Sequence, residues 1–184
     1  LWPEWLAFNK PEGNMFAPDP KTATRVLQDL GINKDSKIVI CHRGADVTIA
    51  ARMFMTLEHF GLNGKVSFLS GGMEAWKRAG FPVTDKAAVF KKGNIELKEE
   101  GALVNKEYVL NALSTTDKVV VDARMKRWYD GDPTGNPRDG HISGALNIPY
   151  PDMIDSTNSF KPVSILEKNF KTVVPFSSII LSKS

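Results

Sequence analysis

Short runs of β-branched and aliphatic residues, each followed at once by a polar or glycine-rich segment, constrain the fold of this chain most. The clearest run covers residues 119–121, three valines that pass directly into an Asp-Ala-Arg sequence at 122–124. A second short apolar run lies within 140–149, just after a Gly-His-Ile sequence at 140–142. Strands that are buried on both faces have such sequences, because helices cover both sides of a parallel sheet. Two strands of a parallel sheet are therefore predicted in this part of the chain.

The same pattern occurs earlier in the chain, where strand-like runs alternate with apolar residues at helical spacing. Capping residues mark the helix boundaries: Asp19 and Pro20 can start a helix that Gly31 ends, and Asn105 can start another. Strands that alternate with helices of this size indicate an α/β fold, a parallel sheet flanked by helices. The predicted strands cover 37–41, 65–69 and 118–122, and the predicted helices cover 20–30, the segment between Asp46 and Gly61, 73–79 and the residues after Asn105.

The alternation stops and then restarts, which indicates two parts in the chain. Residues 85–102 are charged, lysine-rich and weakly periodic, as is typical of a connector. Residues 1–19 are rich in Pro, Asn, Trp and Phe without periodicity, so we expect an ordered loop there. The predicted division is a first part over 1–84, a linker over 85–102 and a second part over 103–184.

Four short motifs stand at the ends of the predicted strands. A Cys-His-Arg-Gly-Ala-Asp loop follows one strand at 41–46, and Gly-Gly-Met-Glu-Ala-Trp follows the next at 71–76. The Asp-Ala-Arg and Gly-His-Ile sequences at 122–124 and 140–142 complete the set. In type and order these motifs resemble the tandem-domain rhodaneses, the thiosulfate/3-mercaptopyruvate sulfurtransferase family. The resemblance implies a rhodanese-like α/β fold with a parallel sheet flanked by helices.

The order of the motifs implies two incomplete repeats. Within one repeat of the family, the Asp-x-Arg and Gly-His-Ile elements precede the cysteine loop and the Gly-Gly element, whereas here they follow them. Residues 1–84 thus resemble the C-terminal part of a first repeat and 103–184 the N-terminal part of a second. Ser177 stands about where the second cysteine would fall. The two partial sheets could also dock and complete each other, as in a permuted single domain.

Cys41 is the candidate catalytic residue. Sulfur transfer of the rhodanese kind needs a thiolate that holds a sulfane sulfur as a persulfide, whereas a free cysteine is mostly protonated at neutral pH. Placement between a strand end and a helix start, beside Arg43 and a curled backbone at Gly44, would favour the anion. The resemblance implies that the loop residues bind the sulfur donor, namely His42, Arg43, Gly44, Ala45 and Asp46.

Other interpretations of this loop are a phosphatase and a structural cysteine. Related phosphatases have an Arg after Cys and five further residues, but Val47 stands there and cannot hold a phosphate. In tandem rhodaneses the working cysteine generally belongs to the second repeat, so Cys41 could instead be a small apolar residue at a strand end. Asp46 replaces the usual Arg, Lys or Thr, and its charge would raise the thiol pKa. His42 and Arg43 resemble loops that take thiosulfate rather than 3-mercaptopyruvate.

Arg124 and Arg127 are the other candidate substrate-binding residues. They resemble two arginines that contact the anionic donor in the second repeat of tandem enzymes, although Trp128 stands at the usual second position. The alternative for Arg124 is an ion pair with Asp122 or Asp139. Structural roles are expected for three further residues: Asp122 bracing the loop backbone, His141 at the sheet edge and Trp76 in the core.

Composition argues against several partner classes. The net charge is only +3, and Lys and Arg are interspersed with nearly as many Asp and Glu, so nucleic-acid binding is not expected. No apolar run approaches the ~18 residues that a membrane span needs. One cysteine and three histidines argue against an internal disulfide and a structural metal site. We therefore expect a soluble protein, cytoplasmic or periplasmic, with no metal or organic cofactor.

The leading hypothesis is a sulfurtransferase. It would move a sulfane sulfur from thiosulfate, or from 3-mercaptopyruvate, to a thiol or cyanide acceptor through a persulfide on Cys41. The alternatives are a non-catalytic rhodanese-like binding or support module and an inactive fragment. Thiocyanate formation from thiosulfate, compared between the wild type and Cys41→Ser, separates the first two hypotheses. Two-state unfolding of the isolated chain would argue against a fragment.

Overall fold

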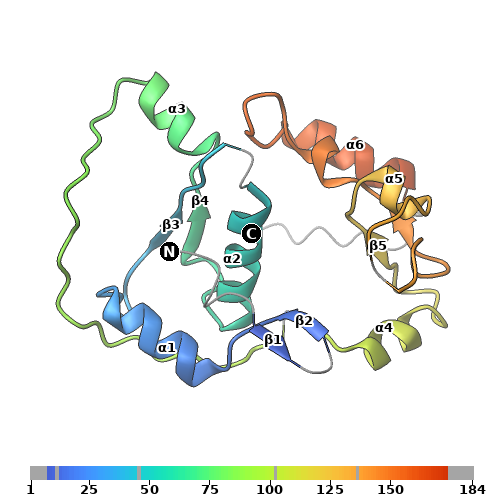
Figure 1. Ribbon diagram of the computed structural model, residues 1–184, viewed down its shortest axis with the longest axis horizontal. Helices are drawn as coiled ribbons and strands as arrows, with labels where there is room; N and C mark the ends of the chain where they lie inside the picture. The colour runs from blue at the N-terminus through green and yellow to red at the C-terminus, as the bar shows by residue number, and fades with distance from the viewer. Residues whose placement is uncertain (1–7, 11–12, 45–46, 102, 136, 174–184) are drawn as a thin grey trace. The chain divides into compact units, whose positions relative to one another are not determined.

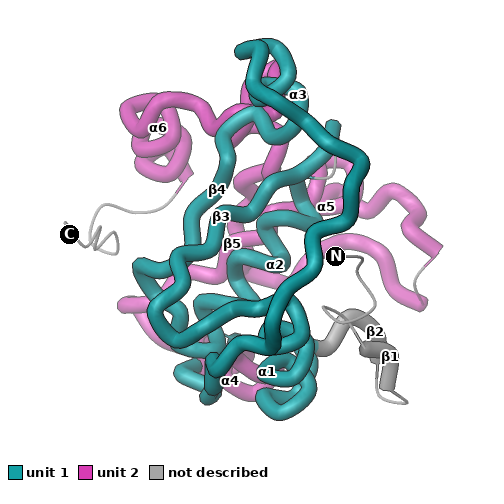
Figure 2. Tube along the Cα trace, turned by 90° about the vertical axis from the view of Figure 1, so that its left-hand side faces the viewer, with its two compact units in different colours: residues 1–103 teal, residues 104–184 magenta. Residues whose placement is uncertain are grey.

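The computed structural model describes residues 8–10, 13–44, 47–101, 103–135 and 137–173 (Figure 1). The chain forms two compact units, Leu1–Leu103 and Val104–Ser184, which are coloured separately in Figure 2. We call them unit 1 and unit 2. The assignment of the chain to two partial repeats with the boundaries given above stays a prediction.

Unit 1 is built on a strand-helix-strand arrangement. Strand β3 (Ile38–Ile40) pairs in parallel with β4 (Val66–Phe68), and helix α2 (Val47–His59) connects them and packs against both. The ring of Phe54 on α2 lies 5.6 Å from that of Phe68 on β4. Helix α3 (Gly72–Arg78) follows β4 at its carboxyl end (Figure 1). The predicted parallel pairing is confirmed, and each strand is slightly shorter than the apolar run that encodes it.

Helix α1 (Pro20–Asp29) has the boundaries that its capping residues predict. The carboxylate of Asp19 accepts hydrogen bonds from the backbone N–H of Thr22 at 2.9 Å and from its hydroxyl at 2.7 Å. Gly31 follows the helix with a φ of 77°, a left-handed conformation that suits glycine. Ala23 and Leu27 are buried on the inner face of the helix, which fixes it to the core.

The core of unit 1 includes residues from the segment predicted to be a linker. Ile95 and Leu97 are 2% and 7% exposed and belong to the same apolar cluster as α1, α2 and both strands. The side-chain amide of Gln28 on α1 donates to the carbonyl of Ile95 at 2.8 Å, and the backbone N–H of Leu97 donates to the hydroxyl of Thr24. Part of the 85–102 segment is thus integral to unit 1, because two of its apolar side chains complete the surface of α1.

The N-terminal region contains a hairpin where a loop was expected. Strand β1 (Phe8–Lys10) pairs antiparallel with β2 (Gly13–Phe16), with an irregularity in the register. Neither run is apolar or strictly alternating, so the usual sequence signals for strands are weak here. The expectation of an ordered loop over 1–19 is therefore wrong for these two strands.

Unit 2 contains a second pair of parallel strands. Helix α4 (Lys106–Ala112) starts at the predicted cap, where the side chain of Asn105 accepts a hydrogen bond from the backbone N–H of Tyr108 at 2.8 Å. Strand β5 (Val121–Asp122) pairs in parallel with β6 (Leu146–Asn147). The other elements are helix α5 (Lys126–Tyr129), a 3-10 helix (Tyr150–Met153) and helix α6 (Val163–Val173). Ser177 lies outside the described residues.

Candidate functional site

Cys41 lies where the sequence places it, directly after β3. It follows Ile40, which is 4% exposed, whereas Cys41 itself is exposed to solvent. Its thiol lies 3.6 Å from the carbonyl oxygen of His42, in the geometry of a weak S–H···O hydrogen bond. The nucleophile candidate is therefore accessible, at the carboxyl end of a parallel strand, where ligands of α/β proteins bind.

Gly44 is held on both sides of its backbone. Its N–H donates to a carboxylate oxygen of Glu74 at 3.0 Å, and its carbonyl lies 3.2 Å from Nδ1 of His42. A carbonyl oxygen can only accept, so this contact requires the proton to be on Nδ1. Helix α3, through Glu74, and the cysteine loop are thus joined by direct hydrogen bonds.

A close backbone approach at the start of α3 makes this junction possible. The backbone N–H of Met73 donates to the carbonyl of His42 at 2.9 Å. Gly72 has a φ of 58°, and a Cβ at this position would lie 2.4 Å from the same carbonyl oxygen. Only glycine fits there, which gives the Gly-Gly sequence at 71–72 a structural reason. His42 is 5% exposed, buried beneath this contact.

The electrostatics of the loop differ from the expectation. Partial burial of the Cys41 thiol raises its pKa, and the negative charge of Glu74 raises it further. The Gly44 N–H lowers the pKa of Glu74, so this carboxylate stays ionised. The predicted stabilisation of a thiolate by the loop amides and Arg43 is therefore wrong in direction. A backbone N–H that was expected to favour the sulfur anion donates to a carboxylate instead.

Sequence reasoning missed Glu74. The available signal was an acidic side chain in the first turn of the helix that follows Gly-Gly, but nothing local links it to a loop 30 positions earlier. Among the predicted donor-binding residues, His42 is buried and Arg43 is exposed. Ala45 and Asp46 lie outside the described residues, and so does the predicted helix cap at Asp46. The donor-binding role of this loop stays a prediction.

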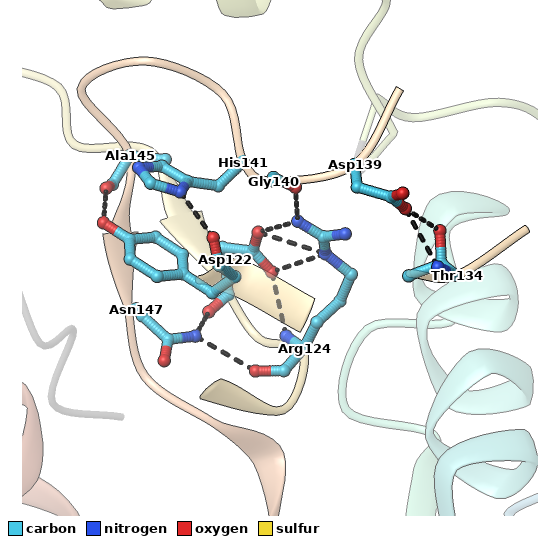
Figure 3. Close-up of polar contacts among 9 residues, drawn as sticks. Asp122, Arg124, Thr134, Asp139, Gly140, His141, Ala145 and Asn147 are labelled. Carbon is cyan, nitrogen blue, oxygen red and sulfur yellow. Dashed lines mark hydrogen bonds and ion pairs between the residues drawn. The ribbon is translucent and has the colours of Figure 1, made fainter. Parts of the chain in front are cut away.

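Arg124 forms an ion pair with Asp122 at the end of β5 (Figure 3). Its Nε lies 3.0 and 3.1 Å from the two carboxylate oxygens of Asp122, and its Nη2 donates to Asp122 and, at 2.8 Å, to the carbonyl of Gly140. The guanidinium lowers the pKa of Asp122 by hydrogen bonding, and Asp122 raises that of Arg124. Of the two partners weighed for Arg124, Asp122 is the one it pairs with, while Asp139 accepts from Thr134.

Neighbouring residues in unit 2 hold the loop after β5 and the segment around Gly140 in place. The carboxylate of Asp122 accepts from the backbone N–H of Arg124 at 2.9 Å, which is the bracing role predicted for it. The side-chain amide of Asn147 donates to the backbone carbonyls of Asp122 and Arg124, at 2.9 and 3.0 Å. His141 stacks on Tyr129 with ring centroids 3.6 Å apart and bonds to the Tyr129 carbonyl through Nδ1 at 2.7 Å. His141 is thus hydrogen-bonded and stacked within unit 2, in keeping with the structural role expected for it, and that role stays a prediction.

An open cavity of about 690 Å³ lies beside this cluster within unit 2. Arg124, Arg138 and His141 are among the side chains that line it. The guanidinium of Arg127 lies elsewhere, 5.0 Å above the ring of Trp128. Arg124 could therefore face a ligand in this cavity, whereas Arg127 contacts the ring of Trp128 on α5. The substrate-binding roles of both arginines stay predictions.

Three other expectations concern Trp76, metals and membranes. Trp76 is half-buried, donates from Nε1 to the carbonyl of Pro82 and packs on Phe81, so its predicted place in the core is wrong. Within the described part of the chain, no group of three or more His, Cys, Asp or Glu side chains could hold a metal ion. Within the same residues, no helix combines the length and apolar composition that crossing a membrane requires.

Known proteins resemble this chain in sequence and in fold. No family model matches it. A probable 3-mercaptopyruvate sulfurtransferase of Pseudomonas aeruginosa is 29% identical over 85% of the chain and 56% of its own length. The 3-mercaptopyruvate sulfurtransferase of Escherichia coli K12 is 30% identical over 74% and 50%. The crystal structure of SseA from Escherichia coli, which has the rhodanese fold, matches with a TM-score of 0.74 at 28% identity, over 84% of this chain and 58% of that one. The chain therefore has the rhodanese fold.

The match to this solved structure confirms the fold class that the motifs imply. The rhodanese fold explains why two short parallel strand pairs carry their polar residues at the carboxyl ends, in the loops after β3 and β5. The chain spans about half the length of the curated relatives that it matches. The names of those relatives therefore describe proteins about twice as long as the matched region.

Proposed function

We propose that this chain is part of a sulfurtransferase that carries sulfane sulfur on Cys41. The observation that carries the proposal is the position of Cys41, an exposed thiol at the carboxyl end of β3 in a fold shared with the crystal structure of SseA. The sulfurtransferase relatives in Pseudomonas and Escherichia support the same activity. The donor would be a small sulfane sulfur compound such as thiosulfate, or 3-mercaptopyruvate, and the acceptor a thiol or cyanide.

The reaction with thiosulfate would proceed in two displacements. The thiolate of Cys41 attacks the outer sulfur of thiosulfate, an S–S bond forms to Cys41 as the S–S bond of the donor breaks, and sulfite leaves with the electron pair. Cyanide then attacks the outer sulfur of the persulfide, thiocyanate leaves, and the Cys41 thiolate is restored. Covalent catalysis of this kind divides one transfer into two easier steps. Neither step calls for a metal or an organic cofactor.

The chain's own residues would set the rate of the first step. Only the thiolate attacks, and the pKa of Cys41 is raised by burial and by Glu74, so a small fraction is reactive at neutral pH. The hydrogen bonds of Gly44 to Glu74 and His42 would hold the loop around the sulfur in one conformation. Slow attack that accelerates with pH is the kinetic behaviour expected of this arrangement.

The test is persulfide formation and thiocyanate production by the chain as it exists. Incubation with thiosulfate should add the mass of one sulfur atom, and cyanide should remove it as thiocyanate. Cys41→Ser should abolish both signals, since this is the single cysteine. Ser67→Ala, an exposed position on the neighbouring strand β4, is the matched control and should leave both unchanged. Absence of any sulfur addition in the folded wild type, from thiosulfate and from 3-mercaptopyruvate, would refute the proposal.

A second candidate is a non-catalytic rhodanese repeat that supports another domain. The raised pKa of Cys41 and the carboxylate on the loop favour it, because both work against a reactive thiolate. Under this candidate, wild type and Cys41→Ser would be equally stable and equally inactive. The same two measurements therefore separate the candidates.

A further inference from the structure

We propose that His42 is a positioning residue for the reaction of Cys41, acting through the carbonyl of Gly44 and not by contact with the sulfur donor. The inference rests on the proposed function and deepens it, because it names the side chain that fixes the loop around the reacting sulfur. The motif implies that His42 binds the donor, whereas a positioning residue works without touching it.

The first support is that two neighbouring side chains differ in exposure. Cys41 is exposed at the end of β3, whereas His42 is 5% exposed. A ring that is buried to this extent has little surface to offer a dissolved anion. Its Nδ1 lies 3.2 Å from the carbonyl oxygen of Gly44, so one of its two nitrogens already has a partner within the loop. The imidazole therefore serves the fold of the loop, while the thiol beside it is open to solvent.

The second support is that the ring of His42 has no room to turn. A Cβ on Gly72 would lie 2.9 Å from Cε1 of His42 and 3.0 Å from its Nδ1, so the imidazole packs directly against the backbone at the start of α3. The backbone carbonyl of His42 accepts the N–H of Met73 at 2.9 Å. A side chain whose rotamer is fixed by packing can hold its hydrogen-bond partner in one place. The first turn of α3 thus fixes both the ring and the backbone of His42.

The backbone that His42 holds is next to the sulfur. Sγ of Cys41 lies 3.6 Å from the carbonyl oxygen of His42. Gly44 has a φ of 50°, and a glycine there is free to adopt other conformations. The hydrogen bond from Nδ1 to the Gly44 carbonyl selects one of them. Attack of a thiolate on an S–S bond depends on such orientation, so His42 would raise the rate of sulfur transfer without touching the donor.

The tautomer of His42 tests the inference in the unmodified chain. A carbonyl oxygen only accepts, so the neutral ring must carry its proton on Nδ1. His59 is the matched control, because it is 8% exposed and its Nδ1 accepts the N–H of Leu103 at 3.4 Å, which places its proton on Nε2. Nitrogen NMR of the neutral rings should therefore show opposite tautomers for these two buried histidines. A proton on Nε2 of His42 would overturn the inference.

Substitutions of His42 separate positioning from packing. His42→Asn places an amide N–H near the position of Nδ1, whereas His42→Leu keeps a similar volume without a donor. We expect His42→Leu to slow sulfur loading from thiosulfate by roughly ten-fold relative to alkylation by iodoacetamide, which needs less orientation. Both reactions use the Cys41 thiolate, so their ratio removes the effect of its pKa. His42→Asn should restore most of the wild-type ratio, and an unchanged ratio in folded His42→Leu would overturn the inference.

Two further variants keep this comparison decisive. His59→Leu removes a buried ring from the end of α2 that is remote in sequence from the cysteine loop, and it should leave the ratio unchanged. A ratio that fell equally in His59→Leu and His42→Leu would mean a general loss of packing and would refute the role of His42. If His42→Leu does not fold, His42→Gln, whose amide reaches the position of Nε2, takes its place and should also lower the ratio.

Amide exchange at Gly44 separates this inference from the proposed function. The Gly44 N–H is bonded to Glu74 at 3.0 Å and exchanges when the loop opens, so it should exchange faster in His42→Leu than in His42→Asn. If no donor loads Cys41 in any of these proteins, the sulfurtransferase proposal fails, and the tautomer and the exchange rate still decide the role of His42. If the wild type is loaded while neither the ratio nor the exchange rate responds to His42→Leu, the role of His42 is refuted and the proposed function stands.

Discussion

The loops after β3 and β5 start from the same plan and reach different electrostatic outcomes. Each follows a short parallel strand, and each brings a carboxylate and an arginine near a backbone turn. In unit 2 the carboxylate of Asp122 pairs with Arg124 two residues later, so the two charges neutralise each other within one loop. In unit 1 Arg43 is exposed, and the carboxylate of Glu74 comes from α3 to take a backbone N–H.

This difference shows that the chemistry of the loop after a strand depends on which group a charged side chain pairs with. The presence of the charged residue in a motif matters less. An internal ion pair braces the loop after β5 and leaves a cavity beside it lined by Arg124 and Arg138. A carboxylate bound to Gly44 braces the loop after β3 equally well, but its charge acts on Cys41 and raises the pKa of the thiol. The first arrangement suits an anion, and the second disfavours one.

The largest expected effect concerns the backbone approach that brings Glu74 to the cysteine loop. Gly72→Ala places a Cβ against the carbonyl of His42 and keeps an unfavourable positive φ, so we expect unit 1 to lose about 3 kcal/mol of stability. Gly64→Ala is the matched control: Gly64 has a φ of 74° but open space around it, so only the backbone cost of about 1 kcal/mol remains. Urea unfolding of both variants measures the difference. Equal losses would mean that the contact with His42 relaxes freely.

A smaller effect is expected from breaking the ion pair in unit 2. Arg124→Ala leaves the mostly buried carboxylate of Asp122 without its partner and removes the donor to the Gly140 carbonyl. We expect a loss of about 2 kcal/mol in the free energy of unfolding. The loss is smaller than for a fully buried pair because Arg124 is partly exposed. Lys126→Ala, which removes an exposed pair with Asp130 on α5, should cost about 0.5 kcal/mol or less.

Amide hydrogen exchange is the suitable measurement for this pair of variants. The N–H groups of Leu146 and Ile148, which bond to Val120 and Asp122, report on the opening of β5 and β6 alone. Faster exchange in Arg124→Ala than in Lys126→Ala is the expected result. Equal exchange would show that the Asp122–Arg124 pair contributes no stability and would leave Arg124 available for ligand binding.

Local signals in the sequence predict the parts of the fold that local physics decides. Asp19 and Asn105 cap their helices as expected, because a cap needs only a side-chain acceptor and an N–H three residues away. The valine-rich and isoleucine-rich runs also form strands at the predicted positions, and each strand pairs in parallel with a second short strand. The position of Cys41 follows directly from the strand before it.

The remainder depends on contacts between distant residues. Ile95 and Leu97 complete the core of unit 1 although their surroundings are charged, because the surface of α1 offers them burial that the sequence around them does not indicate. The electrostatics of Cys41 depend on Glu74, which reaches Gly44 only because a glycine pair lets α3 approach the loop. Motifs thus predict which residues meet at a strand end, but not which charges they will face.

The smallest expected effect, and the most direct on the comparison, is the pH dependence of Cys41 alkylation by iodoacetamide. Only the thiolate reacts, so a raised pKa moves the rate profile to higher pH than for an ordinary cysteine. Glu74→Gln removes one of the two causes and should shift the midpoint to lower pH, but not below that of an ordinary cysteine, since burial is the larger cause and remains. Asp35→Asn, which removes the same charge from an exposed position before the opposite end of β3, should leave the midpoint in place. A wild-type midpoint below that of an ordinary cysteine would mean that the loop after β3 stabilises the anion after all, and the contrast between the two strand ends would disappear.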